Sequence, residues 1–266
     1  MKGILKYEGY KINKESVAKV VDSLTIEHAL EISINDKPFT VVMQTPGDEI
    51  DLATGLLYAE DVISSFDQVE FEEETDERGL INRIHIKIAP NLLGDGYLSS
   101  RSLLSVSSCG ICGKQSLVDL QIQEGKISQS SKKISVESLF KMQGQMVSKQ
   151  INFKESGGCH GVAAFTNTGE LLAIKEDIGR HNAMDKVVGQ LIRDKRLKDA
   201  KVITFSGRIS YEIVSKAFRA KIPIIMAVSA PSTLAIDFAK EYGITILGFS
   251  RNGITTCYSN PENIVF

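Results

Sequence analysis

The chain has 266 residues, which is enough for one large domain or two small ones with a hydrophobic core that needs no disulfide staple. A net charge of −2 and 24% charged residues exclude a general nucleic-acid binder. No apolar run approaches the roughly 18–20 residues that cross a bilayer, and the N-terminus lacks the apolar segment of a secretory signal. We therefore expect a cytoplasmic protein that binds no membrane.

The first third of the chain predicts a small sheet with one helix. Alternating apolar and polar residues place strands at 28–36, 38–45, 67–73 and 81–89. A helix is expected within 46–61, with Asp48 as its cap, because Ile50 and Leu57 fall on one apolar face. Residues 1–100 are thus predicted to form a small N-terminal α+β region.

The middle of the chain is rich in glycine and serine and has no sustained period. We predict a mobile loop over residues 101–134, and a loop of this length in a compact protein is usually functional or disordered. The loop carries Cys109 and Cys112, each followed by glycine. In the reducing cytoplasm such a pair indicates redox, metal or sulfur chemistry more than a structural disulfide.

Residues 135–266 predict an α/β domain. A strand hairpin is expected around Thr168 and Gly169, and it is followed by alternating helices and strands. The helices are expected at 135–150, 181–196, 210–221 and 232–243, and the strands at 161–167, 170–177, 201–206, 222–229 and 244–250. Such alternation favours a mixed, mostly parallel sheet with helices on both faces, which N-terminal strands could also join.

Two chemistries fit the cysteine pair equally well. A thiolate on a loop made pliable by glycine can act as a nucleophile, and Lys114 beside the motif would favour the ionised form. A zinc knuckle also accepts glycine after cysteine, but it needs two further ligands, for which Cys159 and His160 are the only obvious candidates. The spacing does not decide between them.

Small and polar residues follow several predicted strands, where ligands bind in open α/β sheets. Arg180, His181 and Asn182 stand at a predicted helix start, which favours an anion site over ordinary capping by Asp177 and Asn182. The other candidates for binding phosphate groups are Gly207, Arg208, Ser232 and Arg251. Taken singly these could be caps, but together they indicate an extended ligand with several phosphates.

Seven ordered segments resemble those of the formate dehydrogenase accessory sulfurtransferase family (FdhD). The segments are TPGDEIDLATGLLYAED, SSCGICG, GGCHGVAAF, EDIGRHNAMDKVVG, GRISYEIVSKA, APSTLAIDFAKEYGITILGFSR and TTCYSNPENI. The resemblance runs from about Thr45 to the C-terminus. It implies a cytidine-deaminase-like α/β fold for the larger domain and a homodimeric protein.

The resemblance also implies a function. Cys109 would receive persulfide sulfur from a cysteine desulfurase, with Cys112 assisting, and would pass it to the bis(molybdopterin guanine dinucleotide) molybdenum cofactor of formate dehydrogenase. The segment that matches the family's cofactor-binding residues is Phe249, Ser250, Arg251, Asn252, Gly253 and Ile254. That cofactor would be a bound substrate, with no permanent cofactor and no resident metal.

Three other functions compete with sulfur transfer. A zinc-dependent deaminase needs His-x-Glu at a helix start and a later Pro-Cys-x-x-Cys, and neither occurs here, so we reject it. A zinc-bound Cys-x-x-Cys scaffold, or a cofactor chaperone without sulfur transfer, remains open. The sequence also leaves open the roles of Cys159, His160 and Cys257, although Cys257 is expected in a strand.

Overall fold

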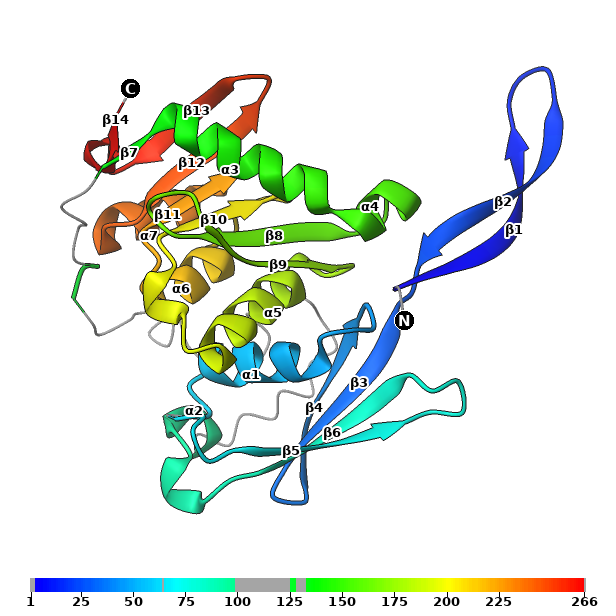
Figure 1. Ribbon diagram of the computed structural model, residues 1–266, viewed down its shortest axis with the longest axis horizontal. Helices are drawn as coiled ribbons and strands as arrows, with labels where there is room; N and C mark the ends of the chain where they lie inside the picture. Colours follow the sequence, from blue (N-terminus) through cyan, green and yellow to red (C-terminus); the bar gives the residue numbers. More distant parts are fainter. Residues whose placement is uncertain (1–2, 64, 99–124, 128–132, 266) are drawn as a thin grey trace.

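The computed structural model describes residues 3–63, 65–98, 125–127 and 133–265. The motif cysteines Cys109 and Cys112, and most of the predicted loop 101–134, lie outside these ranges. The described residues form a two-stranded arm, a four-stranded sheet, a six-stranded sheet and one short two-stranded sheet (Figure 1). None of the described helices is long and apolar enough to span a membrane.

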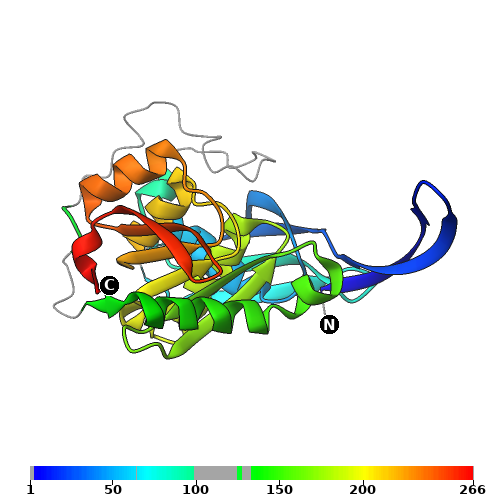
Figure 2. The same ribbon diagram turned by 90° about the horizontal axis from the view of Figure 1, so that it is seen from above.

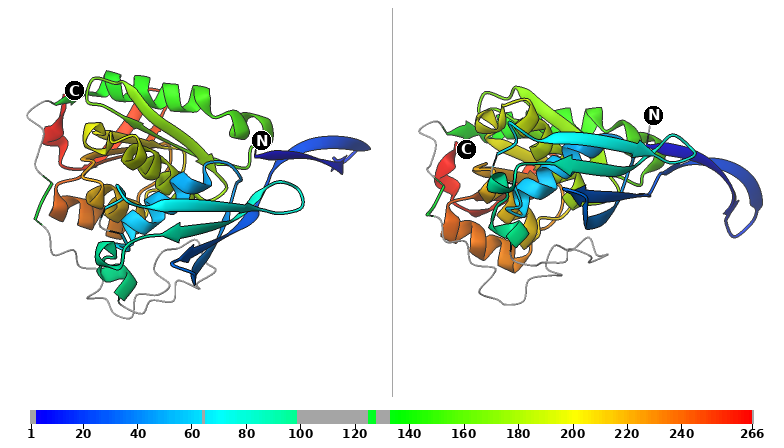
Figure 3. Two further views of the ribbon diagram at one scale, coloured as in Figure 1. Left: turned by 60° about the horizontal axis from the view of Figure 1, so that its bottom comes forward. Right: turned by 90° about the horizontal axis from the view of Figure 1, so that it is seen from below.

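The arm is an antiparallel hairpin of β1 (Ile4–Ile12) and β2 (Val17–Thr25), which points away from the rest of the molecule (Figures 1 and 3). Among the described residues, both strands contact α4 (Ile151–Ser156) at the base of the arm. Most of its side chains are exposed, including large apolar ones such as Tyr10 and Ile12. The apolar side chains of the arm therefore belong to no hydrophobic core among the described residues.

The predicted N-terminal sheet and helix are confirmed. The sheet has the order β4-β3-β6-β5, built from β3 (His28–Ile34), β4 (Lys37–Gln44), β5 (Glu70–Thr75) and β6 (Ile81–Lys87). Its inner face packs on α1 (Glu49–Ala59) through residues such as Leu30, Ile84 and Leu52. Most residues of the acidic run 72–79, at the end of β5 and in the turn to β6, are exposed.

One detail of α1 differs from the prediction. Asp48 occupies the N-cap position, but its carboxylate makes no capping hydrogen bond. That carboxylate instead accepts a hydrogen bond from Lys175 Nζ at 2.5 Å. The side chain that was expected to cap the helix is therefore paired with a lysine from the C-terminal half. The sequence could not show this because the two residues are far apart along the chain.

The six-stranded sheet is the centre of the C-terminal half and has the order β13-β12-β11-β10-β8-β9. Its strands are β8 (His160–Phe165), β9 (Leu171–Asp177), β10 (Val202–Phe205), β11 (Ile224–Ala227), β12 (Thr245–Arg251) and β13 (Ile254–Ser259). Cys257 lies in β13, which confirms its placement in a strand. No N-terminal strand joins this sheet within the described part of the chain.

The α/β class and the mixed sheet are confirmed, although fewer strands are parallel than expected. In the six-stranded sheet only the pairings of β10 with β11 and of β11 with β12 are parallel, and β8 pairs antiparallel with β10. The outer pairs β8–β9 and β12–β13 are antiparallel because short turns join them, and a short turn cannot carry a parallel crossover. The predicted hairpin around Thr168 and Gly169 is one of these pairs.

Helices cover both faces of the large sheet (Figure 2). One face packs on α5 (Arg180–Arg193), α6 (Tyr211–Arg219) and α7 (Thr233–Tyr242). The other packs on α3 (Val136–Lys149), which Ser135 caps by accepting from the Ser138 amide at 3.2 Å. Alternate residues of each strand enter the two cores, as in Val162 and Ala163, so every central strand is buried on both sides.

The remaining elements are short. They are α2 (Asp95–Leu98), the small sheet of β7 (Ile134–Ser135) with β14 (Ile264–Val265), and single turns of 3-10 helix at Pro90–Leu92, Leu197–Asp199 and Pro261–Asn263. The β7–β14 pairing is parallel and joins the start of α3 to the C-terminal residues.

The two halves of the molecule meet where α1 packs on α5 (Figure 1). A Cβ placed on Gly55 would lie 1.9 Å from the Asp185 carbonyl oxygen, and one on Gly189 would lie 1.8 Å from that of Asp51. Glycine at these positions therefore allows the helix backbones to touch. The N-terminal sheet and the large sheet are joined by this contact into one body, on which the candidate site depends.

Candidate functional site

The predicted ligand-binding residues gather at one edge of the six-stranded sheet. The carboxyl ends of β9, β10, β11 and β12 lie there, and antiparallel pairing brings the first residue of β8 to the same edge. Ser206, after β10, ties β8 to this edge, because its amide donates to the Gly161 carbonyl at 3.0 Å and its hydroxyl accepts from the Gly161 amide at 2.9 Å. The edge is thus built from segments far apart in the sequence.

Gly207 lies at the centre of this edge. A Cβ on it would stand 3.1 Å from His160 Nδ1 and 3.8 Å from the Arg180 Cβ, so glycine is what lets these two residues approach. His160 and Arg180 are partly buried, and the next residue, Arg208, is exposed. Burial first, and then the positive charges of Arg180 and Arg208, lower the pKa of His160. The histidine is therefore held as a neutral ring beside two guanidinium groups.

His181, although next to Arg180, points into the protein. It is 7% exposed, and its Nε2 lies 3.2 Å from the Ser210 hydroxyl and 3.8 Å from a Glu212 carboxylate oxygen. These contacts link the start of α5 to the start of α6. His181 therefore positions the two helix starts and is not presented at the edge.

Ser232 caps α7, since its hydroxyl accepts from the Ala235 amide at 3.2 Å. The predicted capping role is thus present, and the exposed side chain also lies at the ligand edge of the sheet. The Ser232 amide donates to the Ile209 carbonyl at 2.9 Å, which fixes this helix start against the loop that carries Arg208.

Residues 249–254 form the tip of the β12–β13 hairpin. Asn252 and Gly253 are its two turn residues, with φ of 54° and 75°, which is the pattern of a type I′ turn. The side chains of Phe249, Arg251 and Ile254 are exposed at the tip. This segment thus offers a cation and two apolar groups to a ligand.

Ser250 is the exception in that segment. It is 1% exposed, its hydroxyl lies 2.7 Å from that of Thr255, and its carbonyl accepts from Gln143 of α3 at 2.6 Å. Its side chain therefore joins the two strands of the hairpin, and its carbonyl fastens the hairpin to α3. The sequence analysis placed Ser250 in the cofactor-binding segment with its neighbours, because a six-residue segment does not reveal which side chains are buried in the folded hairpin.

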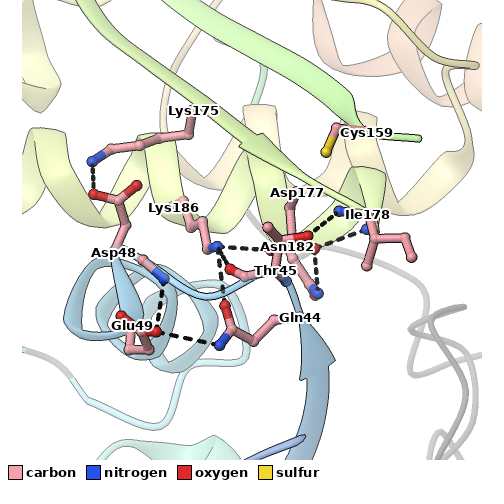
Figure 4. A network of polar contacts seen from close by, with 12 residues as sticks. Gln44, Thr45, Asp48, Glu49, Cys159, Lys175, Asp177, Ile178, Asn182 and Lys186 are labelled. Carbon is pink, nitrogen blue, oxygen red and sulfur yellow. Dashed lines mark hydrogen bonds and ion pairs between the residues drawn. The ribbon is translucent and has the colours of Figure 1, made fainter. Parts of the chain in front are cut away.

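A buried polar network supports the start of α5 from beneath (Figure 4). Lys186 is 1% exposed, and its Nζ lies 2.7 Å from Asp177 Oδ2, 2.6 Å from the Thr45 carbonyl and 3.1 Å from Gln44 Oε1. Asp177 accepts further from the amides of Thr45 and Gly179 and from Asn182 Nδ2, at 2.8–3.0 Å. Asp177 and Asn182 thus fix the turn into α5, which is the structural alternative that the sequence had left open for them.

Cys159 and His160 are neighbours in sequence but have different surroundings. Cys159 is 4% exposed, its Sγ lies 3.2 Å from the Thr25 hydroxyl at the base of the arm, and burial raises the pKa of its thiol. His160 instead lies against Gly207. The two do not converge, and within the described ranges there is no group of three or more His, Cys, Asp or Glu residues that could hold a metal ion.

Sequence reasoning missed Lys186 and Ser206 and assigned no role to His160. A lysine in an amphipathic helix is normally solvated, and Lys186 is buried only because α1 and the end of β4 cover that side of α5. The signal for His160 was present as the glycines around it, but the partner segment 206–208 was not identifiable from sequence.

Known proteins of one family match this chain over nearly its whole length. A family model described as the FdhD/NarQ family matches residues 25–265. "Sulfur carrier protein FdhD" of Sulfolobus acidocaldarius is 38% identical over 258 residues, covering 97% of this chain and 94% of the relative. The protein of the same name from Thermoplasma acidophilum is 40% identical over 251 residues, covering 92% and 87%.

A solved structure shares the fold. The crystal structure of a putative formate dehydrogenase accessory protein from Desulfotalea psychrophila aligns with a TM-score of 0.77 at 22% identity. The alignment covers 98% of this chain and 99% of that one. At this identity the likeness shows the fold alone.

Proposed function

Because the chain belongs to the FdhD/NarQ family, we propose that it is a sulfur carrier that serves the maturation of formate dehydrogenase. In finer terms, it receives persulfide sulfur from a cysteine desulfurase and delivers it to the bis(molybdopterin guanine dinucleotide) molybdenum cofactor, which it binds as a substrate. The observation that carries this proposal is the gathering of Arg180, Gly207 and Arg208 at the sheet edge that the β12–β13 hairpin also faces.

The chemistry needs a nucleophilic thiol, for which we propose Cys109. Its thiolate attacks the outer sulfur of the desulfurase persulfide, so that one S–S bond forms as another breaks and the donor cysteine leaves as a thiolate. Release as sulfide takes two electrons. Attack of the Cys112 thiolate on the Cys109 sulfur supplies them, because it forms a disulfide between the two cysteines and expels hydrosulfide. Both steps balance without a further reagent, and they suit the reducing cytoplasm in which we place the protein.

The cofactor's phosphates and guanines need groups of different kinds. Arg180, Arg208 and Arg251 supply positive charge, and the starts of α5 and α7 supply partial positive charge from their backbone amides. Phe249 and Ile254, 45% and 71% exposed, supply apolar surface at the hairpin tip. We assign the hairpin tip to the outer part of the cofactor and the Gly207 region to its phosphates.

Mass spectrometry of the 100–120 peptide tests the sulfur step. After incubation with a cysteine desulfurase and cysteine, the peptide should gain one sulfur atom on Cys109, and Cys109→Ala should remove the gain while Cys112→Ala retains it. Tightly held stoichiometric zinc without any sulfur gain would instead establish the zinc scaffold. A chain that binds the cofactor but never gains sulfur would be a chaperone only.

A second variant tests the division between thiol and cofactor residues. Arg251→Ala should weaken GDP binding because an exposed guanidinium at the tip is lost, and sulfur gain on Cys109 should be unchanged. Loss of both properties in this variant contradicts the separate roles of loop and hairpin.

We also propose that the protein acts as a homodimer in which each arm lies on the other copy. The arm exposes Leu5, Tyr7, Tyr10, Ile12, Val17 and Val21, and an isolated two-stranded hairpin is only marginally stable in water. The helices at the arm's base expose a second apolar group, Val147, Ile151 and Phe153. A two-fold axis would let each copy's arm cover this group on its partner, which makes the interface self-complementary.

A further inference from the structure

His160 has no assigned role, yet the structure holds it in an unusual position. It is the first residue of β8, its ring is partly buried against Gly207, and no described residue hydrogen-bonds to either ring nitrogen. A fully buried imidazole would need a protein partner, because an unpaired polar group costs free energy when it is shielded from water. Neither ring nitrogen of His160 is among the buried unpaired atoms of the described residues, so both are accessible and can hydrogen-bond to a ligand.

The charges around His160 identify the kind of ligand. Arg180 reaches it from the start of α5 and Arg208 from the loop after β10, and both act on its ionisation. The carboxylate that raises the pKa of His160 is that of Asp177, the residue paired with His160 across β8 and β9. That carboxylate is already occupied by Lys186, two backbone amides and Asn182. Arg208 has no ion-pair partner among the described residues, so the local field favours an anion.

We propose that His160, Arg180 and Arg208 form, over the backbone of Gly207, a pocket for the diphosphate group of the guanine dinucleotide. The inference rests on the proposed cofactor binding and adds to it a residue and a chemical class. A diphosphate offers several acceptor oxygens, which match two forked guanidinium groups and one imidazole N–H. The absence of a side chain on Gly207 leaves room for the three groups to converge, since even a Cβ would crowd His160.

Calorimetric titration of the full-length protein tests the pocket with three probes: GDP, inorganic pyrophosphate and guanosine. His160→Ala and Arg208→Ala should each weaken GDP and pyrophosphate by roughly 10- to 100-fold, which is the range for losing a hydrogen bond to a charged group. Guanosine, which lacks phosphate, should bind all variants alike. His160→Asn, which keeps an N–H donor, should recover part of the affinity.

A matched control is His85→Ala, since His85 is paired with Glu74 on the distant four-stranded sheet at 3.0 Å. This variant should bind all three probes as the wild type does, and circular dichroism should show that each variant is folded. Unchanged GDP and pyrophosphate affinity in folded His160→Ala and Arg208→Ala overturns the pocket.

Failure of the proposed function looks different. If the wild type binds pyrophosphate and loses it in His160→Ala, but never binds GDP in preference to pyrophosphate, the pocket stands and the guanine assignment is wrong. If sulfur never reaches Cys109 while GDP binding depends on His160, the pocket also stands and the carrier role falls. Affinity of the wild type for none of the probes overturns the pocket itself.

Discussion

The arm and the α1–α5 junction are opposite solutions for keeping two segments together. At the junction, helix backbones touch through Gly55 and Gly189, and a buried lysine pairs with a buried aspartate. In the arm, β1 and β2 are held together by backbone hydrogen bonds and by the exposed ion pair of Lys19 with Glu8, and apolar side chains face solvent. The junction buries its contacts within one chain, whereas the arm leaves its apolar side chains exposed. The proposed homodimer would cover them.

The largest effect is expected from breaking the buried pair with Lys186→Met. The change leaves the Asp177 carboxylate buried without its cation, which costs about 3–5 kcal/mol of unfolding free energy. Denaturant unfolding measures this loss. Asp177→Asn combined with Lys186→Met should recover part of it, because no charge then remains buried, and a double variant as unstable as the sum of the singles would show that the pair is not coupled.

The next effect tests the helix contact with Gly189→Ala. The added Cβ would meet the Asp51 carbonyl oxygen, so the helices must separate, at a cost of about 1–3 kcal/mol. Gly144→Ala in α3 is the matched control, because nothing lies near its Cβ position and alanine favours a helix. Thermal melts should therefore move in opposite directions. A Gly189→Ala protein as stable as the wild type would contradict the close approach of the helices.

A smaller effect concerns the pH dependence of the junction. Burial raises the pKa of Asp185 from 3.8 to about 6 in spite of its contact with Lys216 at 2.5 Å. The folded protein therefore holds a proton that the unfolded chain releases, so this group makes unfolding easier as pH rises from about 4 to about 6. Asp185→Asn should remove that fall in the unfolding free energy, measured by denaturant titration across the range.

Glu137 provides the control of opposite sign. It is exposed, and its hydrogen bond with Lys141 lowers its pKa, so its contribution is present above the unfolded pKa and is lost as pH falls. Glu137→Gln should leave the fall between pH 4 and 6 in place. If the unfolding free energies of the wild type and of Asp185→Asn change with pH in the same way across this range, the assignment is contradicted.

The smallest effect on stability is expected in the arm. Replacing Tyr10 and Ile12 by serine should change the unfolding free energy of the diluted protein by no more than about 0.5 kcal/mol per site, because both side chains are already exposed. The same variant should dissociate the homodimer at least about tenfold more readily, since it loses two apolar contacts. Sedimentation at several concentrations measures this, with Lys11→Ser as the control. Unchanged association would remove the arm from the interface.

Much of this protein was readable from its sequence because the signals are local. Alternation and helical periods predicted most strands and helices of both halves and the hairpin around Gly169. The family motifs gave the fold class, which the structure bears out. These signals come from residues close together in the sequence, because a helix or strand that buries one face repeats its apolar residues with a fixed period.

Only the tertiary structure decided which polar residues face the ligand edge. His181 and Ser250 stand in the same motifs as Arg180 and Arg251, yet they turn inward to Glu212 and Thr255. The sequence left the role of His160 open, and only the structure shows that it lies against Gly207 beside Arg180 and Arg208. The burial of Lys186 likewise follows from the packing of α1 on α5. These outcomes depend on contacts between segments far apart in the sequence, and nothing within each segment specifies its distant neighbour.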